Sequence, residues 1–349
     1  MSRVRQKFGF TDTIVRSLWT YRNEKKLGQV VNDIYFPNPV GLAAGFDKNI
    51  ELAPTMKAIG FGFMTGGSVT FYPCEGNPRP WFHRLPKQKS LVVHVGLANE
   101  GTEQIRSRLR AYTPAIFTQF PLVMSVAKTN NPETCNDTQA IADYIGSLQL
   151  LRDEPRVSVL EINISCPNAY GGEPFTEPKR LEQLLKAVDN LKIQKPVWVK
   201  MPINHPWPEF DALLKVIVKH NIQGVTIGNL NKDRGKIPSE ELASQVKGNL
   251  SGLPTQALSD ELIGRTFKSY GDKLSIIGVG GIFTAEDAYR KIRNGASLVG
   301  LITGMIFEGP QLIGQINQDL TRLLEKDGFT NIGEAVGTAH VALAKKILK

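Results

Sequence analysis

Eight short apolar runs, most of them followed by a helical pattern, are the feature that most constrains the fold of this chain of 349 residues. Continuous apolar runs that alternate with amphipathic segments are typical of parallel strands covered by helices. Two such segments, 181–191 and 210–220, place their leucines on one face. The pattern predicts an α/β fold, a (β/α)8 TIM barrel, and leaves a doubly wound sheet as the alternative. The predicted strands are 40–46, 61–68, 122–127, 157–164, 197–201, 224–228, 274–279 and 298–302.

Three segments do not fit a bare barrel. Residues 1–35 precede the first strand and are expected to form a short N-terminal helical extension, so that the barrel domain occupies 36–349. Residues 74–99 contain three prolines and are expected to form a hairpin-like insertion that covers the rim of the barrel. Residues 229–254 are rich in lysine, glycine and serine, and we expect a lid there because long irregular loops in compact domains are often functional.

The composition narrows the classes of function. A net charge of +9 suits an anionic ligand, a phosphate-bearing cofactor or an acidic membrane surface. The basic residues are scattered and do not alternate with aromatic residues, which argues against nucleic acid as a partner. Three cysteines without metal-ligand spacing indicate free thiols in a reducing cytoplasm and no metal site. No apolar run has the roughly 18 to 20 residues of a membrane span, and the basic start lacks the apolar segment of a secretory signal.

The segment 11–22 places apolar residues broadly on one side, with basic residues around them. A helix of this kind either rests on an anionic membrane surface or packs against its own domain. The sequence leaves both interpretations open.

Glycines and lysines gather where the predicted strands end, which is where a barrel of this kind carries its chemistry. Gly278-Val-Gly-Gly281 and Thr303-Gly304 follow the last two strands. Loops at these two positions commonly bind a phosphate group through backbone N–H groups, although glycine pairs also occur in ordinary turns. Lys48 and Lys200 are placed to stabilise negative charge on a ring system or a carboxylate, and a surface ion pair is the alternative for Lys200.

The strand at 157–164 ends in Asn163-Ile-Ser-Cys-Pro-Asn168. Two amides flank the thiol of Cys166 and offer donors and acceptors to a planar polar ligand. A thiol beside such a ligand can take a proton from carbon, whereas the plainer interpretation is a buried cysteine between turn-forming asparagines. With a phosphate-anchored cofactor and two lysines, the pattern favours hydride transfer to a flavin.

These motifs resemble those of the dihydroorotate dehydrogenases, the FMN enzymes of pyrimidine (UMP) synthesis, over about residues 38–337. The first two motifs are most similar to the class 2 enzymes, which are membrane-associated and use quinone. Class 2 enzymes usually carry serine at the position of Cys166, and the soluble class 1 enzymes carry cysteine. The matching motifs are Asn38-Pro-Val-Gly-Leu-Ala-Ala-Gly-Phe-Asp-Lys48, Glu75-Gly-Asn-Pro-Arg-Pro80 with Arg84-Leu-Pro86, Asn163-Ile-Ser-Cys-Pro-Asn168, Leu250-Ser-Gly252, Gly278-Val-Gly-Gly281 and Gly295-Ala-Ser-Leu-Val299.

The resemblance implies a reaction and a site. Dihydroorotate would be oxidised to orotate, with Cys166 as the base and FMN as the hydride acceptor, and quinone is the expected electron acceptor. The implied substrate-binding residues are Lys48, Asn163, Asn168 and Asn229. The implied FMN-binding residues are Ala44, Gly45, Lys48, Ser68, Ser125, Asn163, Lys200, Gly228, Gly252, Gly280, Gly281, Thr303 and Gly304. The class also implies a cytoplasmic protein, bound peripherally at the inner face of the cell membrane through the N-terminal helix.

Several positions depart from the family pattern. Val93 stands where the family has a substrate-binding asparagine, and its neighbour His94 is the candidate to replace that asparagine. Ser125 stands where class 2 enzymes have an asparagine near the flavin, and Leu230 replaces a hydroxyl residue. Ile302 replaces a tyrosine often found before the threonine of the last loop. Two alternatives therefore stay open, a related FMN oxidoreductase for another cyclic amide or enone and a family member without turnover.

The N-terminal region also departs from class 2, because it has room for little more than one of the two helices that form the quinone tunnel there. Arg84 argues the other way, since it matches an arginine at the mouth of that tunnel. The electron acceptor is therefore less firmly implied than the flavin.

Overall fold

The computed structural model describes residues 19–235, 237–238, 241–242 and 246–340. Eight parallel strands close into a barrel, with β13 paired to β3, so the predicted (β/α)8 barrel is confirmed and the doubly wound sheet is wrong. The predicted strands all exist, although the first ends at residue 42 rather than 46. The barrel strands are β3 Val40–Leu42, β4 Phe63–Val69, β7 Leu122–Val126, β8 Val159–Asn163, β9 Val197–Met201, β10 Gly224–Ile227, β12 Ser275–Val279 and β13 Leu298–Leu301.

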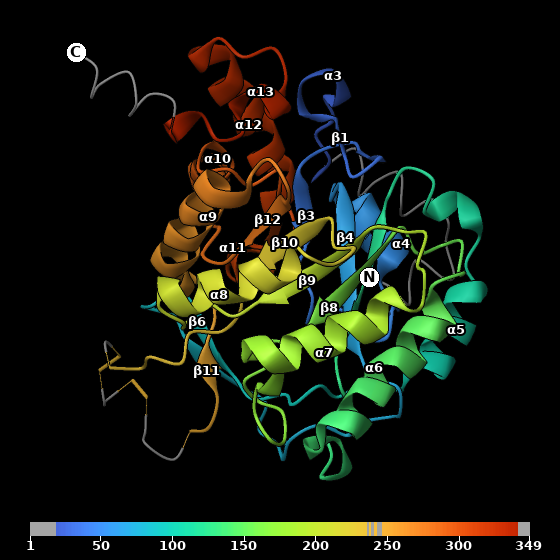
Figure 1. The fold of residues 1–349 in the computed structure, drawn as a ribbon. Helices are drawn as coiled ribbons and strands as arrows, with labels where there is room; N and C mark the ends of the chain where they lie inside the picture. Colours follow the sequence, from blue (N-terminus) through green and yellow to red (C-terminus); the bar gives the residue numbers. More distant parts are fainter. Residues whose placement is uncertain (1–18, 236, 239–240, 243–245, 341–349) are drawn as a thin grey trace.

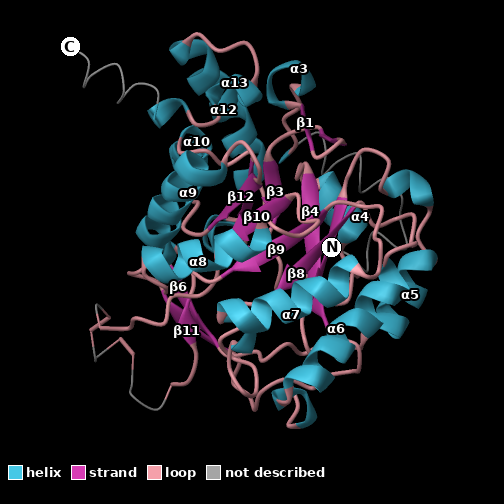
Figure 2. Ribbon diagram, in the orientation of Figure 1, coloured by secondary structure: helices cyan, strands magenta, loops and turns pink. Residues whose placement is uncertain are grey.

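Helices surround this barrel, as Figures 1 and 2 show. The two amphipathic segments expected from the sequence are α7 (Pro178–Asp189) and α8 (Trp207–Ile217), and both bury their leucines against the barrel. The other helices are α3 Glu24–Leu27, α4 Ala53–Ala58, α5 Thr102–Arg110, α6 Asp137–Leu151, α9 Gln256–Tyr270, α10 Ala285–Arg293, α11 Thr303–Glu308, α12 Leu312–Asp327 and α13 Ile332–Ala335. Short 3-10 turns lie at Pro114–Ile116, Glu133–Cys135, Pro174–Thr176 and Leu253–Thr255.

Each barrel strand is buried on both faces, which explains its continuous apolar sequence. Alternate residues such as Phe63, Val159 and Trp198 pack together in the cluster that fills the barrel. Their neighbours Met64 and Leu160 belong to the larger cluster that joins the strands to the helices. A charge in such a strand therefore points at the interior or at a helix, and not at water.

The N-terminal end of the barrel is closed by a hairpin that the sequence pattern did not indicate. Its strands are β1 (Gln29–Val31) and β2 (Ile34–Phe36), joined through Asn32 and Asp33, which both have positive φ, as tight hairpins favour. The ring of Phe36 lies 5.3 Å from that of Phe63, inside the barrel.

Residues 11–18 of the predicted helix at 11–22 lie outside the described residues. Its last described part packs on the barrel, since the Thr20 hydroxyl donates a hydrogen bond to the carbonyl of Ala58 over 2.8 Å. No helix in the described part of the chain is long and apolar enough to cross a membrane. The division of the chain near residue 35 stays a prediction.

The insertion after β4 forms the expected cover. Strands β5 (Phe82–Leu85) and β6 (Ser90–Val93) form an antiparallel hairpin, and β11 (Asn249–Leu250) adds a third strand to it. This three-stranded sheet lies at the opposite end of the barrel from the β1–β2 hairpin (Figure 1). Because β11 belongs to the expected lid at 229–254, that segment is anchored to the insertion at one end, and its movement stays a prediction.

Candidate active site

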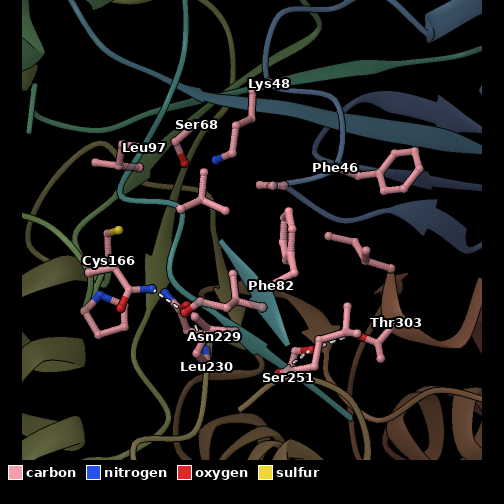
Figure 3. A pocket seen from close by; sticks show the side chains of 18 of the residues that line it. Phe46, Lys48, Ser68, Phe82, Leu97, Cys166, Asn229, Leu230, Ser251 and Thr303 are labelled. Atoms are coloured by element: carbon pink, nitrogen blue, oxygen red, sulfur yellow. Dashed lines mark hydrogen bonds between the residues drawn. The ribbon is translucent and has the colours of Figure 1, made fainter. Parts of the chain in front are cut away.

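A cavity of about 510 Å³ opens where the barrel strands end, next to the three-stranded sheet (Figure 3). It joins most of the residues that the sequence singled out for ligand binding. These are Ala44, Gly45, Lys48, Ser68, Asn163, Cys166, Asn168, Lys200, Asn229 and Thr303. A smaller cavity of about 100 Å³ shares part of this wall and adds Gly228, Gly252, Gly280, Gly281 and Gly304. Among the predicted site residues, Ser125 alone lines neither cavity.

Two lysines face the large cavity without a partner. Lys200 is only 8% exposed and lies next to the last residue of β9, while Lys48 is half-buried in the loop after β3. Among the described residues neither ammonium group has a hydrogen bond or an ion pair. Burial lowers the pKa of Lys48; the nearby thiol of Cys166 opposes this shift, and the charge of Lys200 adds to it. Because a buried charge is costly unless it is paired, this wall of the cavity is built for an anion.

Cys166 lies in the loop that follows β8, the strand next to the one that carries Lys200. Its accessible surface faces the cavity, and its other side packs near Cys74 and Leu97. Burial raises the pKa of the Cys166 thiol, whereas a hydrogen bond from the backbone of Asn168 and the charge of Lys48 act in the opposite direction. Burial therefore disfavours the thiolate of Cys166, and the positive charge of Lys48 at the same cavity favours it.

A chain of hydrogen bonds orders the cavity floor. Asn163 donates its amide N–H to the Ser68 hydroxyl over 2.8 Å, and that hydroxyl lies 2.8 Å from the hydroxyl of Ser125. Ser125 lines neither cavity and supports the hydroxyl of Ser68, so its predicted role as a cofactor contact stays a prediction. Asn229 donates to the hydroxyl of Ser165 over 2.7 Å, and this contact orients its amide at the cavity wall.

The glycines around the small cavity have no room for a side chain. A Cβ atom on Gly281 would lie 2.4 Å from the Cβ of Gln256, and one on Gly304 would lie 2.1 Å from a backbone carbonyl. Gly252 and Gly281 also have positive φ, which favours glycine. Thr303 donates a hydrogen bond to Ser251 over 2.9 Å, as Figure 3 shows. The glycines therefore let these loops pack closely around the small cavity, and phosphate binding there stays a prediction.

The outer part of the large cavity is apolar. Phe82 is 55% exposed and Phe46 is 37% exposed at its mouth. Arg84 also lines it, with its guanidinium group 4.7 Å from the ring of Phe307. Val93 lines the wall as expected, but its neighbour His94 does not and instead meets the amide of Asn77 at 3.3 Å. His94 is thus not the replacement for the missing asparagine.

Two residues near the site were not predicted from the sequence. Glu161 on β8 is 1% exposed, accepts a hydrogen bond from Thr226 over 2.6 Å, and has one oxygen without a partner among the described residues. A charge inside an apolar strand was the signal that could have drawn attention to it. Asn249 on β11 contacts the amide of Asn168 at 3.1 Å. No local signal marks Asn249, because the two residues are 81 positions apart.

The fold and this cavity together define a class of protein, the (β/α)8 barrels with a polar ligand site at the carboxyl ends of the strands. A comparison with protein-family models sharpens the assignment, because the dihydroorotate dehydrogenase model matches residues 26–324. The chain belongs to the dihydroorotate dehydrogenase family.

Individual relatives agree with this assignment. A dihydroorotate dehydrogenase (quinone) from Anaeromyxobacter dehalogenans is 37% identical over 87% of this chain and 83% of its own length. One from Synechocystis is 33% identical over 92% of this chain and 85% of its own length. The ligand-free DHODH structure from Eimeria tenella is similar with a TM-score of 0.84 at 26% identity, over 95% of this chain and 99% of that one. The similarity to relatives named for quinone confirms the class 2 resemblance.

Proposed function

We propose that the protein oxidises dihydroorotate to orotate in pyrimidine synthesis, with FMN as its cofactor and quinone as the electron acceptor. One observation carries the proposal, namely that a single cavity joins Cys166 with the unpaired lysines Lys48 and Lys200 and with amides. Dihydroorotate is a cyclic amide with a carboxylate, and these groups match amides and lysines. The names of the relatives supply the substrate and the acceptor.

The residues present fit FMN. Gly252, Gly281 and Gly304 line the smaller cavity, where their backbone could approach a phosphate, and Thr303 adds a hydroxyl group at the same loop. Lys200 lines both cavities and would meet the ring system where they join. When bound, FMN supplies the acceptor for the hydride.

The chain's own residues perform the proton chemistry. The thiolate of Cys166 takes a proton from C5 of dihydroorotate at its Sγ atom, while hydride leaves C6, so that a C=C bond forms between these carbons. Lys48 pairs with the substrate carboxylate, and burial makes this pairing strong because little water competes. Asn163, Asn168 and Asn229 orient the cyclic amide through their donors and acceptors.

The apolar mouth of the cavity supports a quinone as the acceptor. Phe46, Phe82 and Ile306 offer a surface for an apolar ring beside the polar floor. We place the protein in the cytoplasm at the inner face of the cell membrane, where quinones are dissolved, with the segment 11–22 as its contact. Vesicle sedimentation of the full chain, compared with a variant that lacks residues 1–18, tests the membrane contact.

An anaerobic titration with dihydroorotate tests the reaction. The visible absorbance of the flavin should bleach as substrate is added, and quinone should restore it faster than fumarate or oxygen. Bleaching that only fumarate or oxygen reverses would contradict the acceptor. A yellow protein that dihydroorotate leaves unchanged would contradict the substrate.

A second candidate is a related FMN oxidoreductase for another cyclic amide or enone. Val93 favours it, because this side chain lines the cavity and offers no hydrogen bond where the family has an amide. Losing one such bond costs about 1 to 3 kcal/mol. A substrate screen decides between the two, since a wide margin for dihydroorotate over its analogues would exclude the second candidate.

A further inference from the structure

The side-chain amide of Asn168 is held from two sides by the covering sheet. Its Nδ2 group donates to the carbonyl oxygen of Val93 on β6 over 2.9 Å. Its Oδ1 atom accepts from the Nδ2 group of Asn249 on β11 over 3.1 Å. Asn77 adds a third contact by donating to the backbone carbonyl of Asn168 over 3.1 Å. The loop that carries Cys166 is therefore tied to three points of the insertion sheet and its flanks.

These contacts fix which end of the amide faces which neighbour. A backbone carbonyl can only accept a hydrogen bond, so Val93 must meet the NH₂ end of Asn168. The oxygen of Asn168 then faces Asn249, which must present its own NH₂ group. Each end of the Asn168 amide keeps one further bonding position, a donor hydrogen and an acceptor lone pair.

The strand register explains why Asn249 can do this. Asn249 lies directly opposite Val93 in the antiparallel ladder between β11 and β6. Side chains of directly opposed residues lie on the same face of a sheet and about 4.5 to 5.5 Å apart at Cβ. Val93 lines the cavity and has no amide, while the residue across from it has one and directs it at Asn168.

We propose that Asn249 is a positioning residue for substrate binding, which holds the amide of Asn168 in the orientation that reads a cyclic amide. Asn249 lines neither cavity, so it acts through Asn168 and not by touching the substrate. It also couples β11, and with it the end of the segment 229–254, to the loop of Cys166. The inference rests on the proposed function and specifies how this chain orders its substrate site with valine at position 93.

Titration of the FMN-loaded protein with orotate, followed by the change in flavin absorbance, tests this role. Asn249→Ala removes the donor and should raise the Kd of orotate about tenfold. Asn249→Asp is nearly isosteric but turns a donor into an acceptor, so binding at neutral pH should weaken by at least as much. Lys247→Gln is the control in the same segment, because Lys247 is exposed and has no partner among the described residues.

The Asp variant also carries a readout that a packing role would not produce. Below the pKa of the introduced carboxyl group, its O–H can donate to Asn168 again, so the affinity for orotate should recover relative to wild type as the pH falls. His94, which follows β6, and Cys166 and Lys48 at the cavity are present in both proteins, so the ratio of variant to wild-type Kd at each pH isolates the new group. This variant keeps the test valid even where Asn249→Ala folds poorly.

The possible outcomes separate the two proposals. Weaker binding in both variants with recovery at low pH supports the positioning role. A wild-type protein that binds orotate while both variants bind it equally well overturns the role of Asn249 and leaves the proposed function standing. A wild-type flavoprotein that responds to neither orotate nor dihydroorotate overturns the proposed function and this inference with it.

Discussion

Replacement of Cys166 by alanine should slow the reduction of the flavin by dihydroorotate without removing the cofactor. Cys166 is the thiol that lines the large cavity, and it does not line the smaller cavity where the glycines proposed to bind the phosphate lie. Loss of a positioned base typically costs about a hundredfold to ten-thousandfold in rate, or about 2.7 to 5.4 kcal/mol in the barrier. The bound flavin should still give its yellow colour, because the residues that hold it are unchanged.

The rate of flavin reduction should also increase with pH if Cys166 is the base. Burial raises the pKa of the Cys166 thiol, so at neutral pH most molecules carry the protonated form, which cannot act as a base. The rate of flavin reduction should therefore rise about tenfold per pH unit below that pKa and level off above it. Burial also lowers the pKa of Lys48, and loss of its charge at high pH should weaken substrate binding.

Anaerobic stopped-flow absorbance at a series of pH values measures this rate directly. Cys135→Ala is the control, because Cys135 is exposed and lines neither cavity. A Cys166→Ala protein that reduces its flavin at the wild-type rate would refute the assignment of the base. An alkaline limb that persists unchanged in that variant would show that another group titrates.

Three further changes test other parts of the structure. Lys200→Met should weaken FMN binding about tenfold or more, measured by flavin fluorescence on reconstitution of the apoprotein, while the exposed Lys219→Met should leave it unchanged. Gly281→Ala should lose FMN and thermal stability because its Cβ would lie 2.4 Å from that of Gln256. Gly172→Ala is the matched control, because Gly172 has a similar φ of +70° and its Cβ would have nothing within 4 Å. This control should lower the free energy of unfolding by only about 1 to 2 kcal/mol. Phe36→Ala should lower the free energy of unfolding in urea by about 3 to 5 kcal/mol, whereas the 67% exposed Val30→Ala in the same hairpin should change it by less than about 0.5 kcal/mol. Equal losses in either of the last two pairs would contradict the packing described for the Gly281 loop or the hairpin.

The amino-acid sequence determined the barrel and most of its site because both depend on local patterns. Each strand reads as an apolar run, and parallel strands bring their carboxyl ends to one rim. Lys48, Cys166 and Thr303 could therefore be assigned to one cavity before their distances were known. The insertion at 74–99 could also be predicted, from its length and its prolines.

Only the tertiary structure decided how the site is supported. Ser125 contacts the hydroxyl of Ser68 and lines neither cavity, since its place along β7 sets its depth in the barrel. The β1–β2 hairpin fills the N-terminal end of the barrel with Phe36. The sequence did not predict this hairpin, because strands of three residues are too short to show a clear periodicity. Asn249 reaches Asn168 because β11 joins a sheet built from residues more than 150 positions earlier. Contacts of this kind form when the barrel closes, and a local sequence pattern carries no record of which distant residues that closure brings together.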